Sequence, residues 1–227
     1  MKRLPIAIVA ILFCSAPLFA ASLTGKISFV SKRGQTPTVN ETLVWLEPAA
    51  GAKVAAKRPV ATPTQLTTRS KAVVPHVIAV PAGSTVAFPN DDPISHNLFS
   101  LSSGNAFDLG LYRKGAGKTH KFDSPGVVNV YCNVHPNMSA VVHVMSSPWY
   151  VFADAAGNYS LADVPAGKYR LIAWNEQGGS VESPIEITAA GKVAGNLNLT
   201  LDSRNYREQQ HLNKVGKPYE APRTRDY

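Results

Sequence analysis

Residues 124–145 read SPGVVNVYCNVHPNMSAVVHVM, and the pattern of this segment indicates the architecture of the chain. Two short runs rich in β-branched residues, Val127–Cys132 and Ala140–Met145, surround a polar loop, and the first run follows the turn signal Ser124-Pro125-Gly126. Runs of this length and composition, bounded by Pro, Gly or Asn, are typical of β-strands. We therefore predict two strands joined by a tight loop that carries a cysteine, a histidine and a methionine.

The same pattern of short β-branched and aromatic runs between turn residues recurs along most of the chain. No run shows the 3.6-residue spacing of a long amphipathic helix. The sequence therefore predicts an all-β protein with a sandwich architecture. The further predicted strands are Thr24–Val30, Thr42–Glu47, Val73–Val80, Ser84–Phe88, Asn158–Leu161, Tyr169–Trp174, Ile185–Thr188 and Leu197–Leu201.

The composition sets the broad class of the protein. The chain has 227 residues, of which 44% are hydrophobic and 17% are charged. That apolar fraction is enough for a packed core and excludes global disorder. The length suits one large domain or two small ones. The sequence contains neither a heptad run nor a collagen-like repeat, so the fibrous classes are excluded as well.

Residues 1–21 have the composition of a secretory signal peptide. Two basic residues open the segment, an apolar stretch runs from Leu4 to about Phe19, and Ala20 and Ala21 provide a small-residue exit. The alternative is a membrane anchor, but the stretch is only about 16 residues long and contains prolines, so cleavage is favoured. No later apolar run is long enough to span a bilayer. We therefore expect a periplasmic or otherwise exported protein, with no membrane span after cleavage.

Cleavage would leave Cys132 as the single cysteine, because Cys14 lies in the signal segment. A single cysteine in an exported protein cannot form an internal disulfide. A free thiol in an oxidising compartment is a liability unless something protects it. Binding to a metal ion would give that protection.

Cys132, His135 and Met138 follow one another at intervals of three residues. A tight loop can direct such side chains towards one point, and two His with one Cys and a weak axial Met form the trigonal site of blue copper proteins. The second histidine must come from elsewhere, and His96, after a Pro-containing loop, is the candidate. Taken singly, each residue has a simpler explanation as a core methionine, a hydrogen-bonded histidine or an inert buried thiol. Their combination favours copper.

Four blocks of the sequence resemble those of the cupredoxins. The loop from Cys132 to Met138 is similar to the short ligand loop of amicyanin, and it is shorter than that of plastocyanin. The resemblance implies a Greek-key β-sandwich over residues 62–146 with one type 1 copper ion per chain. The blocks similar to those of periplasmic methylamine utilization and plastocyanin-like proteins are Phe88–Asp92, His96–Ser100, Phe107–Tyr112 and Cys132–Ala140.

The resemblance also implies a role for each metal ligand. Cys132 would bind as the thiolate and give an intense charge-transfer band. His96 and His135 would complete the trigonal plane, and Met138 would be the long axial ligand that helps to set the reduction potential.

The same resemblance implies roles for residues next to the ligands. The backbone N–H of Asn97 would reach the sulfur and its side chain would brace the ligand loops, with Asn90 as a second supporting residue. His135 would lie near the surface as the exit for electrons. Pro136 and Ile94 would belong to an apolar rim on which a redox partner docks.

Four basic residues lie close together between two of these blocks. They belong either to a solvated loop or to a docking surface for an acidic redox partner, whose binding would be salt-sensitive. Nucleic acid is not expected as a partner, because the protein is predicted to be exported and its aromatic residues are not interleaved with the basic ones. The residues are Arg113, Lys114, Lys118 and Lys121.

A second unit is indicated by the segment Val151–Asn175, which resembles the transthyretin-like modules related to carboxypeptidase regulatory domains. The first strands of such a module occur far upstream, so we predict a discontinuous sandwich of residues 22–47 plus 147–201, with the cupredoxin inserted. The alternative is two consecutive domains that divide near Pro148. Residues 202–227 form a polar tail, and we expect it to be disordered or extended rather than a functional arm.

These patterns predict an exported blue copper protein that carries single electrons and turns over no substrate, so it would not be an enzyme. One alternative is a periplasmic copper carrier or chaperone that uses the same ligands. The chain has only three methionines, which argues against that alternative because metal exchange favours a Met-rich surface. Another is an adhesion or binding sandwich in which the metal site is structural.

Overall fold

The computed structural model describes residues 20–49, 64–208 and 210–219. The predicted signal segment therefore lies outside the described residues except for its last two positions. Within these ranges the protein consists of 17 strands and one short 3-10 turn, Val39–Glu41, without an α-helix. The all-β prediction is thus confirmed. No helix in the described ranges has the length and apolar character needed to cross a membrane.

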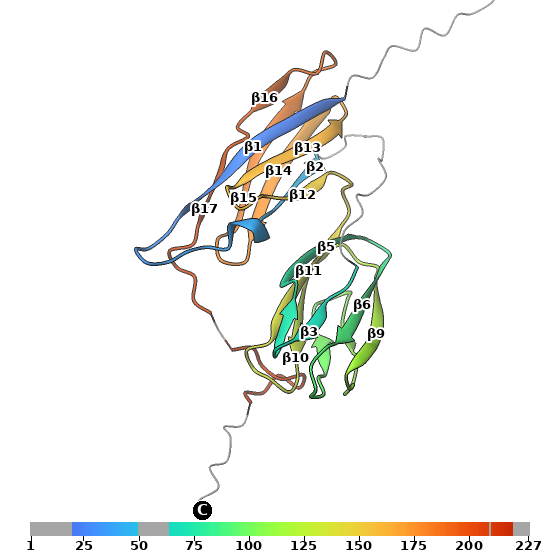
Figure 1. Ribbon diagram of the computed structural model, residues 1–227. Coiled ribbons are helices and arrows are strands. Elements are labelled where there is room, and N and C mark those ends of the chain that lie inside the picture. The colour runs from blue at the N-terminus through green and yellow to red at the C-terminus, as the bar shows by residue number, and fades with distance from the viewer. Residues whose placement is uncertain (1–19, 50–63, 209, 220–227) are drawn as a thin grey trace, which may run out of the picture.

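One β-sandwich, which we call the terminal sandwich, combines strands from both ends of the chain (Figure 1). Its strands are β1 (Ala21–Val30), β2 (Leu43–Pro48), β12 (Tyr150–Phe152), β13 (Asn158–Val164), β14 (Gly167–Asn175), β15 (Gly179–Ile187), β16 (Val193–Gly195) and β17 (Leu199–Asp202). One sheet has the order β13-β1-β17, and the other has the order β12-β2-β14-β15-β16. β1 pairs antiparallel with β13 and parallel with β17, so the first strand of the fold is held by two late ones.

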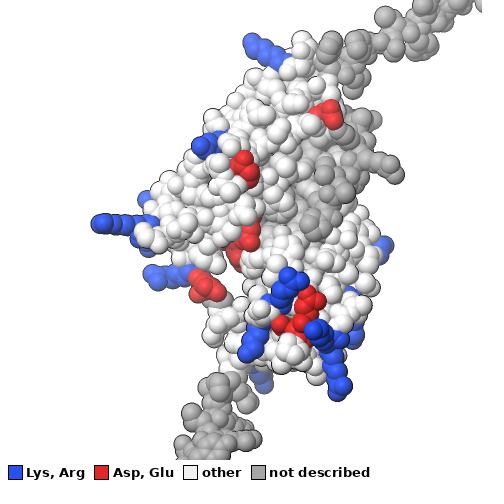
Figure 2. Space-filling view, in the orientation of Figure 1, with Lys and Arg blue, Asp and Glu red and all other residues white. Residues whose placement is uncertain are grey.

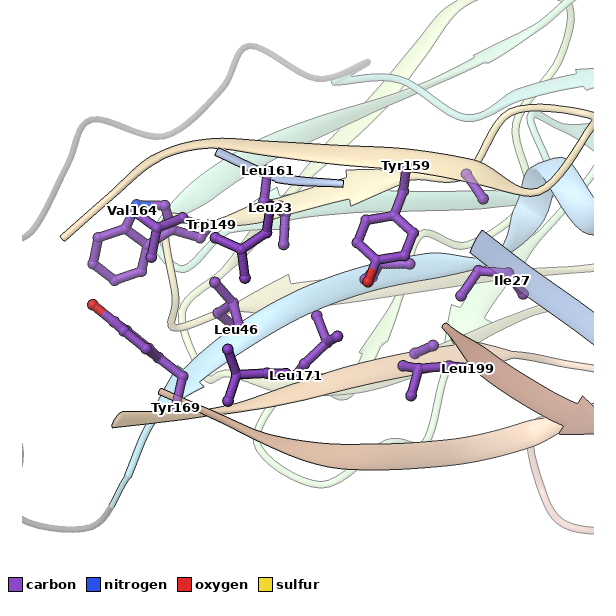
Figure 3. Packing of buried hydrophobic residues seen from close by; sticks show 14 of the residues in the cluster. Leu23, Ile27, Leu46, Trp149, Tyr159, Leu161, Val164, Tyr169, Leu171 and Leu199 are labelled. Carbon is purple, nitrogen blue, oxygen red and sulfur yellow. The ribbon is translucent and has the colours of Figure 1, made fainter. Parts of the chain in front are cut away.

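The core of the terminal sandwich lies between these two sheets (Figure 3). Leu23 and Ile27 point inward from β1 because successive side chains of a strand alternate between its two faces. They belong to the same buried cluster as Leu46 of β2 and Leu171 of β14. Complete burial of one such side chain contributes about 1.5–3 kcal/mol relative to leaving it exposed.

The other β-sandwich, which we call the middle sandwich, contains strands that lie between β2 and β12 in the sequence. Its strands are β3 (Thr67–Arg69), β4 (Ala72–Val74), β5 (Val77–Pro81), β6 (Ser84–Asn90), β7 (Leu98–Ser100), β8 (Phe107–Asp108), β9 (Gly115–Phe122), β10 (Gly126–Cys132) and β11 (Ser139–Met145). The two sheets have the orders β5-β11-β10-β7-β8 and β4-β3-β6-β9. A second buried cluster fills the space between them, and Cys132 and Met138 belong to it.

Two details of the middle sandwich differ from the sequence prediction. The predicted strand Val73–Val80 is divided between β4 and β5, which lie in different sheets. Pro75 lies at the break, where its missing N–H cannot contribute to a ladder. Of the four predicted basic residues, Lys118 and Lys121 belong to the edge strand β9 rather than to a loop. β9 is exposed along most of its length, so its sequence lacks the apolar alternation that marks a strand.

A small apolar cluster joins the two sandwiches. Leu43 of β2 and Tyr150 of β12 pack with Ala79 of β5 and Met145 of β11. Burying these surfaces together removes apolar area from water on both sides of the junction. The middle sandwich is therefore attached to the terminal sandwich by packing as well as by the chain.

The buried imidazole of His143 lies beside this junction, with its ring centroid 6.1 Å from that of Trp45 and 4.2 Å from that of Trp174. Its Nε2 has no hydrogen-bond partner among the described residues. Burial lowers the pKa of His143 from the ordinary value of 6.5 to about 4. The unfolded chain therefore binds this proton more readily than the folded protein, and the stabilisation present above the unfolded pKa is lost as the pH falls towards the folded one.

We expect the free energy of unfolding, measured by urea titration, to decrease by about 3 kcal/mol through His143 between pH 7 and pH 4. The His143→Phe variant should lack this component, because a phenyl ring binds no proton. Comparison of the two pH profiles removes the contribution of the carboxylates, which the variant retains. Equal profiles for the two proteins would contradict the prediction.

The described part of the C-terminal segment leaves the terminal sandwich after β17 and continues to the loop end of the middle sandwich (Figure 1). There the hydroxyl of Tyr219 contacts the backbone of Cys132. The described residues of this tail, 202–208 and 210–219, thus connect the terminal sandwich with a contact on the middle sandwich. Residues 220–227 lie outside the described part of the chain.

Candidate metal centre

The loop between β10 and β11 places three of the predicted ligands on one tight turn. Tyr131 and Ser139 form the last pair of the ladder, so Cys132 is the final residue of its strand. The Cys132 N–H donates to the Met138 carbonyl at 2.9 Å, and the Met138 N–H donates to the His135 carbonyl at 3.3 Å. These bonds close the loop and fix the direction in which its side chains leave the backbone.

His96 reaches the same end of the sandwich through backbone pairing. It exchanges two backbone hydrogen bonds with Tyr112, at 3.1 and 2.9 Å. The next residue, Asn97, accepts a hydrogen bond at its carbonyl from the Asn133 N–H at 2.8 Å. Asn133 follows Cys132 directly, so this bond ties the two ligand-bearing segments together.

The three strong donors converge on one point. The Sγ of Cys132 lies 3.7 Å from His96 Nδ1 and 3.7 Å from His135 Nδ1, and all three ligand atoms lie within 4.8 Å of one another. A metal ion bonded to sulfur at about 2.3 Å and to nitrogen at about 2.0 Å, with 120° between the bonds, would place those atoms about 3.7 Å apart. The arrangement therefore fits a metal ion.

The burial of the donors suits a soft metal shielded from water. Cys132 and His96 are 0% exposed, and Met138 is buried in the same core cluster. His135 is only partly buried. Burial, and then the electrostatic effects of His96 and Lys71, lower the pKa of His135 below its ordinary value. A neutral imidazole is the form that binds a metal.

Asp92 is the main functional candidate that the sequence analysis did not assign. Its Oδ2 accepts a hydrogen bond from His96 Nε2 at 2.8 Å, and its side chain is only 9% exposed. A carboxylate on one ring nitrogen leaves the other nitrogen, Nδ1, free to face the metal, and it strengthens that nitrogen as a donor. The one sequence signal was the position of Asp92 in the block Phe88–Asp92, four residues before His96.

A two-residue turn between β3 and β4 holds Asp92 in place. The N–H groups of Ser70 and Lys71 donate to its two carboxylate oxygens at 2.6 and 2.9 Å. Both residues have positive φ, at 53° and 59°, which costs about 1–2 kcal/mol for each non-glycine residue. Burial raises the pKa of Asp92, but the hydrogen bonds from Lys71, His96 and Ser70 together lower it below the usual value.

Asn90, predicted as a supporting residue, is buried beneath the His96 loop. Its Oδ1 accepts hydrogen bonds from the Thr68 hydroxyl at 2.8 Å and from the Asp92 N–H at 2.9 Å. Its Nδ2 donates to the Ile94 carbonyl at 2.9 Å. The side chain therefore connects both ends of this loop to β3.

Asn97, predicted to brace the ligand loops, has contacts with both β8 and the Cys132 loop. Its side-chain Nδ2 donates to Asp108 Oδ1 at 2.6 Å in β8. The contact with that loop comes from its backbone carbonyl, because the register of β7 against β10 puts this group opposite Asn133. The ammonium of Lys214, hydrogen-bonded to Asp108, lowers the pKa of that carboxyl to about 2.

The structure separates the predicted docking residues into two groups. Ile94 is 39% exposed and Pro136 is partly buried, and both lie on the loops that carry the ligands.

The basic residues of the predicted docking surface form the second group. Lys118 bonds to the Leu109 carbonyl, and Lys121 pairs with Asp123 at 2.6 Å. Figure 2 shows acidic side chains among the basic ones on the face of the middle sandwich turned to the viewer. The surface there carries mixed charge. The other two predicted basic residues, Arg113 and Lys114, are exposed.

Comparison with known proteins gave likeness to solved structures only. No family model matches the chain, and no curated protein does. A purple cupredoxin from Nitrosopumilus maritimus is 26% identical, over 36% of this chain and 99% of that one, with a TM-score of 0.33. An oxidised amicyanin variant is 18% identical, over 44% of this chain and 92% of that one, with a TM-score of 0.34. A copper-containing nitrite reductase from Thermus scotoductus is 21% identical over 53% of this chain, which spans 28% of that protein, with a TM-score of 0.35.

Proposed function

We propose that the middle sandwich is a cupredoxin domain that holds one type 1 copper ion and carries single electrons between redox partners. The observation that supports this most directly is the buried Cys132 sulfur with a histidine nitrogen 3.7 Å away on each of two segments. His96, Cys132 and His135 are the strong ligands in this proposal, and Met138 is the weak axial one. Bound copper supplies the one-electron chemistry.

The contribution of the protein is a ligand set that moves little. Cys132 ends a central strand, its loop is closed by backbone hydrogen bonds, and His96 is held by Asp92. A site that keeps one arrangement in both oxidation states needs little reorganisation when an electron is transferred. The complete burial of His96 and Cys132 also keeps water from the metal.

His135 is the least buried of the four proposed ligands, so we place the entry and exit of electrons there. Ile94 and Val134 expose apolar surface on the two ligand loops. A redox protein with a complementary apolar patch would bring its own centre close to His135 by docking on this rim. In this proposal the protein turns over no substrate and is not an enzyme.

We extend the proposal to the rest of the chain. Residues 22–47 and 147–201 would form one transthyretin-like domain in which the cupredoxin domain is inserted. The pairing of β1 with β13 and β17, and of β2 with β12 and β14, supports this division. The composition of residues 1–21 supports export to the periplasm or another compartment outside the cytoplasm.

Copper titration of the metal-free protein tests the function. We expect one equivalent of Cu(II) to produce an intense visible charge-transfer band and a copper EPR signal, both reversibly lost on reduction. The Met138→Leu variant should keep an intense band at a shifted wavelength, because the axial contact changes while the thiolate bond remains. A protein that stays colourless with Cu(II) would contradict the proposal, and tight binding of Cu(I) alone would indicate a copper carrier instead.

A further inference from the structure

The C-terminal segment makes direct contact with the backbone of the proposed ligand loop. The Tyr219 hydroxyl donates to the Cys132 carbonyl at 2.6 Å. The Lys214 N–H donates to Asn133 Oδ1 at 3.0 Å, and its ammonium donates to Asp108 Oδ2 at 2.7 Å. Residues almost 90 positions apart in the sequence therefore meet at the residue that carries the thiol.

An aromatic stack adds to these polar contacts. The ring of His211 stacks on Tyr131, with centroids 4.4 Å apart and planes inclined by 19°. It also makes edge-to-face contacts with the rings of Tyr219 and Phe99, with centroid distances of 5.4 Å and 6.4 Å. Tyr131 directly precedes Cys132, so the segment holds the strand on both sides of the proposed ligand.

The segment has a local structure of its own. The Gly216 N–H donates to the Asn213 carbonyl at 2.9 Å, and the Asn213 N–H donates to the Lys217 carbonyl at 2.8 Å. The Asn213 side chain accepts further hydrogen bonds from the N–H groups of Val215 and Lys217. Gly216 has a φ of +73°, a value that glycine adopts at little cost. This turn sets the positions of Lys214 and Tyr219 relative to each other.

The contacts of Lys214 complete a closed ring of hydrogen bonds. Asn97 donates from its side chain to Asp108, which binds Lys214, which binds the side chain of Asn133. Asn133 in turn donates its N–H to the Asn97 carbonyl. Asn97 and Asn133 each follow a proposed ligand, His96 and Cys132. The ring therefore constrains the distance between the two segments that supply the nitrogen and the sulfur.

We propose that residues 210–219 are a clamp that positions Cys132 for metal binding. Tyr219 and Lys214 are its positioning residues, and neither touches the metal. Ser203, which precedes the clamp in the chain, is anchored to the terminal sandwich by its N–H, which donates to the Val30 carbonyl at 2.9 Å. The expected effect of the clamp on copper binding rests on the proposed function. The expected effect of the clamp on the exposure of the Cys132 thiol does not.

Two truncations of the full chain test the clamp. Ending the chain after Glu208 removes the clamp, whereas ending it after Tyr219 removes only residues beyond the clamp and serves as the control. The first readout uses metal-free protein: the rate at which a thiol reagent labels Cys132, followed by peptide mass mapping to separate it from Cys14. We expect labelling at least about tenfold faster without the clamp, because local opening exposes the buried thiol.

The second readout uses copper. We expect removal of the clamp to weaken copper binding by about 10-fold to 100-fold and to shift the charge-transfer band, as loss of groups that orient a ligand does in other metal sites. A synthetic peptide of residues 205–219 should restore both readouts. Two point variants guard against a truncation that fails to fold. Tyr219→Phe removes one hydroxyl, and Lys214→Ala is compared with Lys217→Ala, which removes an exposed side chain from the same turn.

Equal labelling of Cys132 in the two truncated proteins, or in the wild type and both point variants, would overturn the clamp. If loss of the clamp speeds the labelling of Cys132 but the wild-type protein forms no copper band, the clamp is sustained and the copper proposal is refuted. If every variant is labelled as slowly as the wild type and forms the normal copper band, the clamp is refuted and the copper proposal is sustained. The two proposals therefore fail separately.

Discussion

Replacement of Cys132 by serine will abolish the intense visible band of the copper-loaded protein. The band requires a thiolate bonded to copper, and Cys132 is the one cysteine near His96 and His135 among the described residues. A serine hydroxyl is a poor ligand for copper at neutral pH, so we also expect copper binding to weaken by a factor of about 100 or more. Absorption spectroscopy and competition with a copper chelator measure the two effects.

The fold should survive this replacement. Cys132 is fully buried and serine is nearly the same size, so the main penalty is a buried hydroxyl, which costs about 1–3 kcal/mol if it finds no partner. Circular dichroism should therefore be unchanged, with a lower melting temperature. In the uncleaved chain, the Cys14→Ser variant is the matched control and should keep the band. An intense band of the same wavelength in the Cys132→Ser protein would refute the ligand assignment.

Replacement of Asp92 by alanine should have the second largest effect. It removes the acceptor for His96 Nε2 and leaves the N–H groups of Ser70 and Lys71 without their carboxylate. We expect copper affinity to decrease by about 10-fold to 100-fold, which is the usual effect of removing a carboxylate that orients a metal-bound histidine. Affinity is measured by chelator competition on the holoprotein.

Asp92→Asn separates charge from shape at the same position. The amide keeps a similar size but lacks the negative charge that strengthens His96 as a donor. A weaker imidazole donor stabilises Cu(II) less, so we expect the reduction potential to rise in both Asp92 variants. NMR of the metal-free protein should show His96 protonated on Nε2 in the wild type and a changed tautomer balance in the alanine variant.

Asp91→Asn is the matched control for these variants. Asp91 is adjacent in sequence but exposed, and it pairs with Arg69 at 2.7 Å rather than with a proposed ligand. We expect the wild-type affinity and potential in this protein, because a surface ion pair contributes little. Equal losses in the Asp91 and Asp92 variants would show that local charge, and not the bond to His96, is responsible.

Local sequence determined the parts of this protein that depend on neighbouring residues. Strand segments such as Val127–Cys132 were predictable, because burying one or both faces of a strand demands β-branched residues over a short run. The interval of three residues between Cys132, His135 and Met138 was also readable, since one tight turn brings them together. The edge strand β9 was not readable as a strand, because its exposed faces place no demand on residue type.

Only the tertiary structure decided which distant residues meet. The side chain of His96 donates to the carboxylate of Asp92. That carboxylate is held in place by hydrogen bonds from two N–H groups of a turn more than 20 residues earlier in the chain. The polar segment around Lys214 and Tyr219 has too few apolar residues for its sequence to predict that it packs against the fold. Its Tyr219 nevertheless hydrogen-bonds to the backbone of Cys132. Such contacts are single polar bonds with exact geometry, and they leave no periodic pattern in the chain. Hydrophobic patterning encodes the sheets. The hydrogen bonds that support the proposed site form only after the sheets have brought these groups within bonding distance.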